Sequence, residues 1–216
     1  MSSDNLTVLR DRISYQALLL GGFSLVATAL LVAGNLATRD DIALRLKEDM
    51  QASLAQVIPA SLHDNDILAN PLTVNDPNGL PVTVYRGAMG ARVNALAWEV
   101  VGQGYAGDIR LLMGLNANGE ILGVRVIAHA ETPGLGDKIE INRNDWILGF
   151  NGLSLGNTPQ AQWAVDKDGG RFDAFSGATI TPRAVVGAVK KGLDWFQANR
   201  TAIVNAPMVT TPVMEE

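Results

Sequence analysis

The stretch DIRLLMGLNANGEILGVRVIA, from Asp108 to Ala128, decides the expected fold because it reads as two strands joined by a tight turn. Apolar residues fill both halves, Asp108–Leu115 and Ile121–Ala128, and Asn116–Gly119 lies between them. Asn-Gly favours a hairpin because both residues tolerate the positive φ angles that such turns need. The stretch therefore predicts an antiparallel β-hairpin.

Two apolar stretches before the hairpin extend the expected sheet. Val82–Tyr85 and Ala95–Val101 are rich in β-branched and aromatic residues, which favour strands. Residues 61–81 contain Asn-Pro, Asn-Asp-Pro-Asn-Gly and Leu-Pro, so we expect loop there. Residues 151–170 predict further loop, with a short strand near 163–165.

Helical patterns lie on both sides of the strands. Apolar residues recur at helical spacing from Asp40 or Asp41 to about Val57, and Pro59 ends that pattern. Residues 145–150 predict a short helical turn. The layout, antiparallel strands flanked by helices, is α+β.

The last expected helix begins at Pro182, with Thr181 as its N-cap, and runs to about Asn199. Proline suits the first turn of a helix because its fixed φ angle matches and its missing N–H costs nothing there. We expect its buried face to consist of Val185, Val189, Leu193 and Phe196.

An uncharged stretch near the N-terminus predicts a membrane anchor. No charged residue occurs from Ile13 to Thr38, and as a helix this stretch would be about 39 Å long, enough to cross a hydrocarbon core of about 30 Å. A cleaved signal peptide is the alternative, with Val32-Ala33-Gly34 as its cleavage site, but the apolar stretch is longer than such peptides carry. Arginines flank both ends, so charge hardly decides the orientation.

Five regions follow from these patterns. They are a short tail (1–12), the anchor (13–38), a stalk helix and loop (39–81), an α+β domain (82–200) and a flexible C-terminal tail (201–216).

Composition excludes several kinds of function. The sequence has no cysteine, which excludes disulfides, iron–sulfur ligation by thiolates and a cysteine nucleophile. The net charge of −5 argues against nucleic acid as a partner. Neither a glycine-rich dinucleotide fingerprint nor a phosphate-loop pattern occurs. One His and one Glu two residues apart, His129 and Glu131, supply too few ligands for a metal site, and we expect none.

Ser176-Gly177-Ala178-Thr179 is the most definite chemical handle in the chain. Gly177 and Ala178 leave the backbone open to a bulky group, and the following helix start offers a positive end that stabilises an anion by about 0.3–1 kcal/mol. No base lies next to Thr179 in the sequence, so we expect it to accept a phosphoryl group from another enzyme rather than to act as a nucleophile. The alternative is an ordinary capping turn.

A second motif, His129-Ala130-Glu131-Thr132-Pro133-Gly134-Leu135-Gly136, follows the hairpin. Glu131 and Thr132 can offer an acceptor and a hydroxyl to the polar edge of a ring. Gly134 and Gly136 would let backbone N–H groups reach a ligand. The alternative is a connecting loop with an exposed carboxylate and a surface histidine whose hydrogen bonds are satisfied.

Together these motifs resemble the FMN-binding domain of the G subunit of the Rnf electron-transport complex. The C subunit of the sodium-translocating NADH:quinone reductase forms a similar sister family. The resemblance also rests on the single span, Pro59, His63–Asp66 and Gly104–Ile109. The compact length and His63–Asp66 favour the Rnf protein.

The resemblance implies FMN joined covalently through its phosphate to Thr179 by a flavin transferase, in a domain on the periplasmic side of a bacterial inner membrane. The chain would then be an electron-relaying subunit of an ion-translocating complex, a translocase component that is not a complete enzyme alone. Its partners would be the other membrane and peripheral subunits and membrane lipid. The further candidate cofactor-binding residues are Ser176, Gly177, Ala178, Glu131, Thr132, Gly134 and Leu135.

Two rival functions remain open on the sequence. One is a subunit of the sodium-translocating quinone reductase. The other is a membrane-tethered binding or assembly module without flavin.

Overall fold

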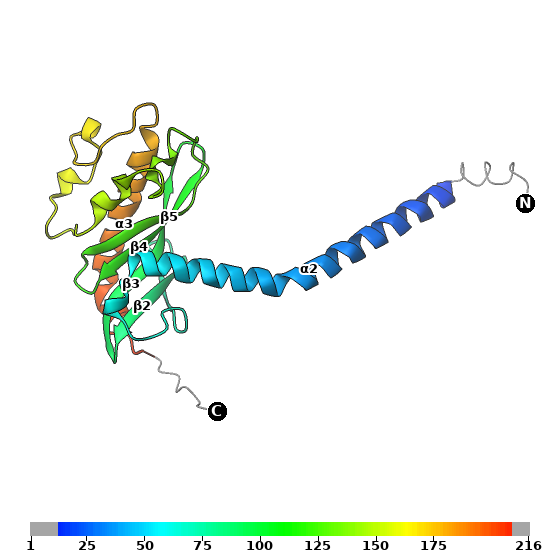
Figure 1. Cartoon of the computed structure of the whole chain (residues 1–216), viewed down its shortest axis with the longest axis horizontal. Helices are drawn as coiled ribbons and strands as arrows, with labels where there is room; N and C mark the ends of the chain where they lie inside the picture. Colours follow the sequence, from blue (N-terminus) through cyan, green and yellow to red (C-terminus); the bar gives the residue numbers. More distant parts are fainter. Residues whose placement is uncertain (1–12, 209–216) are drawn as a thin grey trace, which may run out of the picture. The chain divides into compact units, whose positions relative to one another are not determined.

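The computed structural model describes residues 13–208, with side chains from residue 15. The chain divides into two compact units between Asp49 and Met50, and helix α2 (Ile13–Val57) runs from the first unit into the second (Figure 1). The predicted tail at 1–12 lies outside the described residues. The expected anchor and the expected second helix form one continuous helix.

In the first unit, helix α2 contains the uncharged stretch that the sequence predicts as a membrane anchor, residues 13–38. Among the described residues, one helical segment, Tyr15–Val57, is long and apolar enough to cross a membrane by length and composition. Large apolar side chains such as Leu18 and Phe23 are exposed along it. This agrees with a single-pass anchor.

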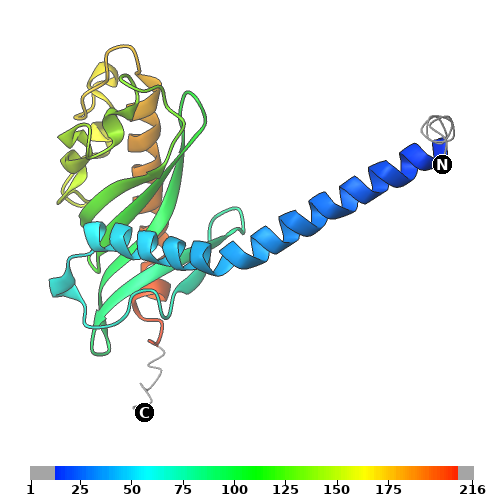
Figure 2. The same ribbon diagram turned by 45° about the vertical axis from the view of Figure 1, so that its right-hand side comes forward.

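The second unit is built on a five-stranded antiparallel sheet in the order β1-β2-β3-β4-β5 (Figure 2). The strands are β1 (Leu72–Asn75), β2 (Pro81–Met89), β3 (Arg92–Gln103), β4 (Asp108–Asn116) and β5 (Ile121–Ala128). The predicted hairpin is confirmed: β4 pairs with β5, and Gly119 in the turn has φ +90°. The antiparallel α+β class is confirmed as well.

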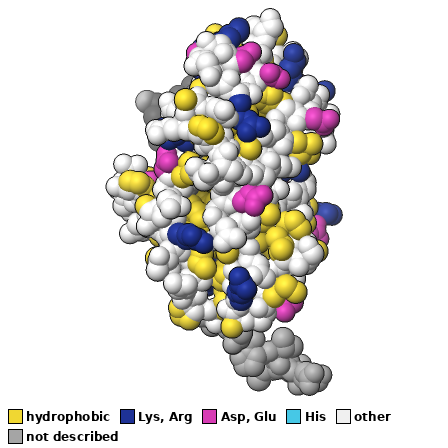
Figure 3. Space-filling model, turned by 90° about the vertical axis from the view of Figure 1, so that its left-hand side faces the viewer, with side chains coloured by type: hydrophobic (Ala, Val, Ile, Leu, Met, Phe, Trp, Pro, Cys, Tyr) yellow, Lys and Arg dark blue, Asp and Glu magenta, His cyan; other side chains and the backbone are white. Residues whose placement is uncertain are grey.

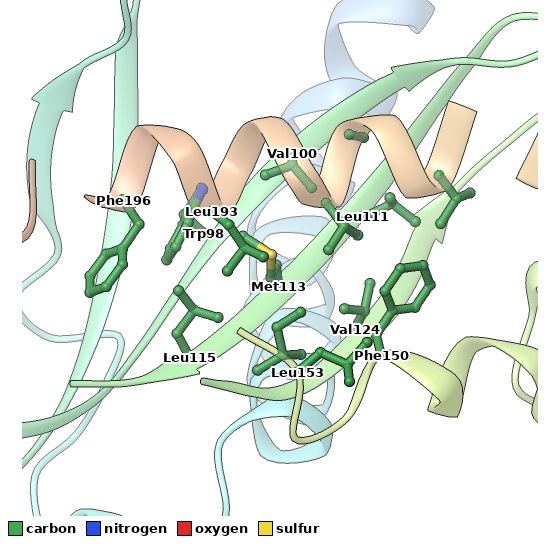
Figure 4. Packing of buried hydrophobic residues seen from close by; sticks show 14 of the residues in the cluster. Trp98, Val100, Leu111, Met113, Leu115, Val124, Phe150, Leu153, Leu193 and Phe196 are labelled. Carbon is green, nitrogen blue, oxygen red and sulfur yellow. The ribbon is translucent and has the colours of Figure 1, made fainter. Parts of the chain in front are cut away.

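Each face of the sheet is covered by a helix because residues alternate along the strands. Trp98, Val100, Leu111 and Met113 face helix α3 (Ile180–Val204), and Figure 4 shows them packed against Leu193 and Phe196. The opposite face, with Ala95, Ala97 and Leu112, packs on the end of α2 and on the residue after it, through Leu54, Val57 and Ile58. All four residues predicted for the buried face of α3 are buried.

The loops between β5 and α3 contain short 3₁₀ helices. They are η2 (Asp137–Ile139), η3 (Asp145–Phe150), η4 (Gln160–Gln162) and η5 (Asp166–Asp168), and η1 (Ala60–Leu62) follows α2. The predicted helical turn at 145–150 is confirmed as η3. The strand expected near 163–165 is wrong, because only an isolated bridge joins Val165 to Phe172.

Two further expectations differ from the structure. Residues 61–81 are not all loop, since β1 pairs along β2 from Leu72 to Asn75. The last helix ends at Val204, not near Asn199, so the tail does not begin at 201. Ile203 is fully buried, and Arg86 donates hydrogen bonds to the carbonyl oxygens of Ala206 (2.8 Å) and Pro207 (3.3 Å). Residues 209–216 of the predicted tail lie outside the described residues.

Candidate functional site

The two motifs singled out in the sequence meet in one open pocket of about 300 Å³. Gly177, Ala178 and Thr179 form one wall. Glu131, Thr132, Leu135 and Gly136 form another, and Tyr105 and the first residues of α3, Ile180 and Thr181, complete the lining. Among the predicted site residues, Ser176 and Gly134 do not line the pocket.

Thr179 lies directly before the first residue of α3, with φ −73° and ψ −20°, and its side chain caps no backbone N–H. It is half-buried, and Gly177 turns the chain before it with φ +82°. Backbone N–H groups of the first helical turn have no acceptor within the helix, so they point toward the pocket end of α3. Thr179 therefore occupies the positive end of a long helix, as expected.

Thr181 is not the N-cap that the Thr-Pro pattern predicts. The helix begins at Ile180, two residues earlier than predicted, and the Thr181 side chain is buried. Its hydroxyl donates a short hydrogen bond to Glu131 Oε2 instead. The capping prediction is wrong because a partner from the β5–α3 loop competes for the hydroxyl.

Glu131 is buried, with 4% of its surface exposed, so the alternative of an exposed carboxylate is wrong. Besides the bond from Thr181, its Oε1 accepts a hydrogen bond from the Ala106 backbone N–H at 2.9 Å. Each carboxylate oxygen thus already has a donor from the protein. The carboxylate forms part of the pocket wall.

The glycines of the 129–136 motif act mainly through their small size and turn geometry. Gly136 donates its N–H to Thr132 O at 3.0 Å within the turn, so this N–H already has a partner in the protein. Gly134 has φ +78°. A Cβ at Gly136 would lie 2.8 Å from Glu131 Cβ, so this position has no room for a side chain.

His129 makes hydrogen bonds with both ring nitrogens. Its Nδ1 accepts the Glu131 backbone N–H at 3.0 Å, and its Nε2 lies 2.6 Å from Glu140 Oε1. These contacts give the satisfied hydrogen bonds of the alternative interpretation, but only 11% of the side chain is exposed, so His129 is not a surface histidine. Within residues 13–208, no cluster of three or more His, Cys, Asp or Glu residues could hold a metal ion.

Tyr105 is a pocket residue to which the sequence motifs assign no chemistry. Its side chain is 74% exposed and lies in the turn between β3 and β4. Leu135 and Ile180, exposed to 42% and 44%, add apolar surface at the same opening. In the sequence, Tyr105 was noted only as part of the Gly104–Ile109 stretch of the family resemblance, and it was not predicted as a site residue.

An aromatic cluster supports the turn that carries Thr179. Phe175, directly before Ser176, contacts Trp146 with ring centroids 5.1 Å apart, and Phe172 stacks on Phe150 at 4.4 Å. Trp146 Nε1 also donates to Asp173 O at 2.9 Å. The turn is therefore anchored from inside by apolar packing.

Arg183, one turn into α3, pairs with Asp168 of η5 through two hydrogen bonds of 2.6 and 2.7 Å. These hydrogen bonds hold the pKa of the Asp168 carboxyl below its usual value and raise the pKa of Arg183. The pair is exposed, so it orients the loop more than it stabilises the fold. Arg183 is thus already neutralised by Asp168.

Comparisons with known proteins show the family to which the pocket residues belong. Residues 104–194 match the FMN-binding domain family, and this range contains all the pocket residues. The G subunit of the ion-translocating oxidoreductase complex of Cereibacter sphaeroides is 53% identical over 191 residues, covering 88% of this chain and 87% of the relative. The same protein of Stutzerimonas stutzeri is 49% identical, covering 89% and 84%. The crystal structure of Shewanella oneidensis NqrC gives a TM-score of 0.47 at 20% identity, covering 70% of this chain and 73% of that one.

Residues 104–194 are therefore an FMN-binding domain by family, and an apolar helix precedes it in the chain. The chain belongs to the family of G subunits of ion-translocating oxidoreductase complexes. This confirms the resemblance to the Rnf protein that the motifs carry.

Proposed function

We propose that the protein is a membrane-anchored flavoprotein subunit that relays electrons through FMN bound covalently to Thr179, within an ion-translocating oxidoreductase complex. One observation carries the proposal. The folded chain brings Thr179 and the 131–136 loop, far apart in the sequence, into the same pocket beside the start of α3.

The pocket fits a flavin attached from one side. It is open and, at about 300 Å³, lies at the small end of ligand sites, which suits a group held by a covalent tether rather than by enclosure. Exposed Tyr105 and Leu135 offer apolar surface to a ring system. The start of α3 would stabilise the phosphodiester anion.

The attachment requires a separate flavin transferase, because among the described residues no base is hydrogen-bonded to the Thr179 hydroxyl to activate it. In the transfer, a bond forms between Thr179 Oγ1 and the flavin phosphorus while a phosphoanhydride bond of an activated flavin nucleotide breaks. The hydroxyl proton is released, and the mononucleotide on the other side of the broken phosphoanhydride bond is the leaving group. The chain gains the mass of FMN minus one water.

Bound FMN supplies reversible redox chemistry, and the chain supplies placement. Thr132 is exposed at the pocket and can offer its hydroxyl to the ring edge. Glu131 is buried in the pocket wall, where it accepts hydrogen bonds from Ala106 and Thr181. The open pocket leaves the ring accessible to other redox groups, as a relay needs, and the chain alone completes no substrate turnover.

The assignment to a complex rests on the relatives, which are named as subunits of ion-translocating oxidoreductases. The partners are accordingly the other membrane and peripheral subunits, and the length and apolar composition of the N-terminal helix support an anchor in membrane lipid. We assign the domain to the periplasmic side of a bacterial inner membrane. The net charge of −5 fits a protein that does not bind nucleic acid.

Thr179→Ala tests the attachment. After co-expression with the flavin transferase, the wild type should show flavin fluorescence in a denaturing gel and the mass of FMN minus water, and Thr179→Ala should lose both completely. Thr201→Ala removes an exposed hydroxyl on the same helix and should keep full loading. Fluorescence that persists in denatured Thr179→Ala would rule out this residue as the attachment point.

A further inference from the structure

We propose that Glu131 is a positioning residue that locks the walls of the flavin pocket to one another, and that His129 holds Glu131 in place. This inference rests on the proposed function, because the geometry it fixes is that of Thr179 relative to the ring-facing loop. We call Ala106, Glu131 and Thr181, with His129 and Glu140, the Glu131 latch.

The carboxylate of Glu131 joins three segments that line the pocket. Its Oε2 accepts the hydroxyl of Thr181, which lies two residues after Thr179 on α3. Its Oε1 accepts the N–H of Ala106, next to Tyr105, at 2.9 Å. Glu131 itself begins the loop that carries Thr132 and Leu135. A single side chain therefore sets the distance between attachment point and ring contacts.

Two glycines leave room for the Glu131 side chain. A Cβ at Gly104 would lie 2.5 Å from Glu131 Oε1, and one at Gly136 would lie 2.8 Å from Glu131 Cβ and 3.0 Å from Thr181 Oγ1. Both glycines are thus in close contact with the latch. Burying a carboxylate costs free energy unless hydrogen bonds compensate, so losing either donor should loosen this region.

His129 supports the backbone of Glu131 from the other side. Its Nδ1 accepts the Glu131 N–H at 3.0 Å, so the proton of the neutral ring lies on Nε2 and is donated to Glu140 at 2.6 Å. Of these two partners, only Glu131 lines the pocket. The effect of His129 on the flavin must therefore pass through Glu131.

Paired substitutions separate hydrogen bonding from size. Thr181→Val keeps the shape but removes the donor, whereas Thr181→Ser keeps the donor. His129→Gln removes the acceptor near the backbone, whereas the shorter His129→Asn places an amide oxygen near the Nδ1 position. Thr158→Val is the matched control, because Thr158 is buried like Thr181 but lies away from the pocket.

We expect Thr181→Val and His129→Gln to accept FMN fully by mass, yet to lose the visible circular dichroism that a fixed flavin shows. Amide exchange of Ala106 and Glu131, measured on flavin-free protein, should become at least about tenfold faster in Thr181→Val, since a buried hydrogen bond has been lost. Thr181→Ser and His129→Asn should resemble the wild type. Thr158→Val should lower the melting temperature without altering the flavin spectrum.

The proposal is overturned if loaded Thr181→Val keeps the wild-type dichroism and amide exchange, or if Thr181→Ser is as impaired as Thr181→Val. It is also overturned if His129→Asn gives no recovery over His129→Gln. If the wild type itself carries no covalent flavin, or if Thr179→Ala still does, the proposed function fails instead. The two failures therefore give different results.

Discussion

Among individual residues, Gly170 allows two segments of the loop before Thr179 to pack closely against each other. Its N–H donates to Val165 O at 2.9 Å, and Phe172 N–H donates to Ala164 O at 3.2 Å. A Cβ at Gly170 would overlap the carbonyl oxygen of Ala164. The bridge between Val165 and Phe172 therefore requires glycine here.

Gly170→Ala should lower the free energy of unfolding by about 1–3 kcal/mol, because backbone rather than a flexible side chain must move. Urea denaturation of the flavin-free protein measures this. Gly149→Ala is the control: that glycine is exposed and a Cβ there meets nothing within 4 Å, so the change should stay within about 0.5 kcal/mol. Equal stabilities for the two variants would contradict the argument.

Single residues also show which features of the site can be predicted from the sequence. Gly177 and Thr179 lie where their motif predicts, because a small-residue turn before a helix is a local property. Thr181 is assigned wrongly because a capping pattern considers only neighbours along the chain, whereas its partner Glu131 lies 50 residues away. The burial of Glu131 depends on donors from two distant segments, which no local pattern contains.

Among the secondary-structure elements, α3 lies on the sheet at a point where β3 has no side chain. A Cβ at Gly102 would lie 2.6 Å from Ala184 O in the second turn of α3. This close approach brings the start of the helix beside the β3–β4 turn that carries Tyr105. Elsewhere α3 has room: a Cβ at Gly187 meets nothing within 4 Å.

Gly102→Ala and Gly187→Ala should therefore change stability in opposite directions. The first pushes helix backbone off the sheet and should cost about 1–3 kcal/mol. The second removes a flexible residue from a helix interior and should add up to about 1 kcal/mol. Thermal denaturation measures both, and a stabilising Gly102→Ala would show that the helix does not approach β3 as described.

Elements were predictable where their pattern is long and regular. The β4–β5 hairpin and the buried face of α3 follow from Asn-Gly and from helical spacing. Strand β1 has only four residues and follows Asn-Pro, so its pairing with β2 is set by the neighbouring strand rather than by its own residues. The end of α3 lies beyond the predicted Asn199, and Ile203, seven residues after Phe196, continues the buried helical face there.

For the molecule as a whole, the domain surface mixes charges of both signs. On the face shown in Figure 3, hydrophobic side chains occur in several places between Lys or Arg and Asp or Glu residues. This mixed surface suits a domain that is exposed to water and attached to the membrane by its apolar helix. The absence of cysteine from the sequence makes the orientation of that domain directly measurable.

A single introduced cysteine should report on which side the domain lies. Ala161 is exposed in the domain, so Ala161→Cys should react with a membrane-impermeant maleimide in cells with a permeabilised outer membrane and an intact inner membrane. Ser3→Cys, on the other side of the apolar stretch, should react only after the inner membrane is opened. The wild type gives no background because it lacks thiols. The reverse labelling pattern would place the domain, and its flavin, in the cytoplasm, where it would have to exchange electrons with different subunits.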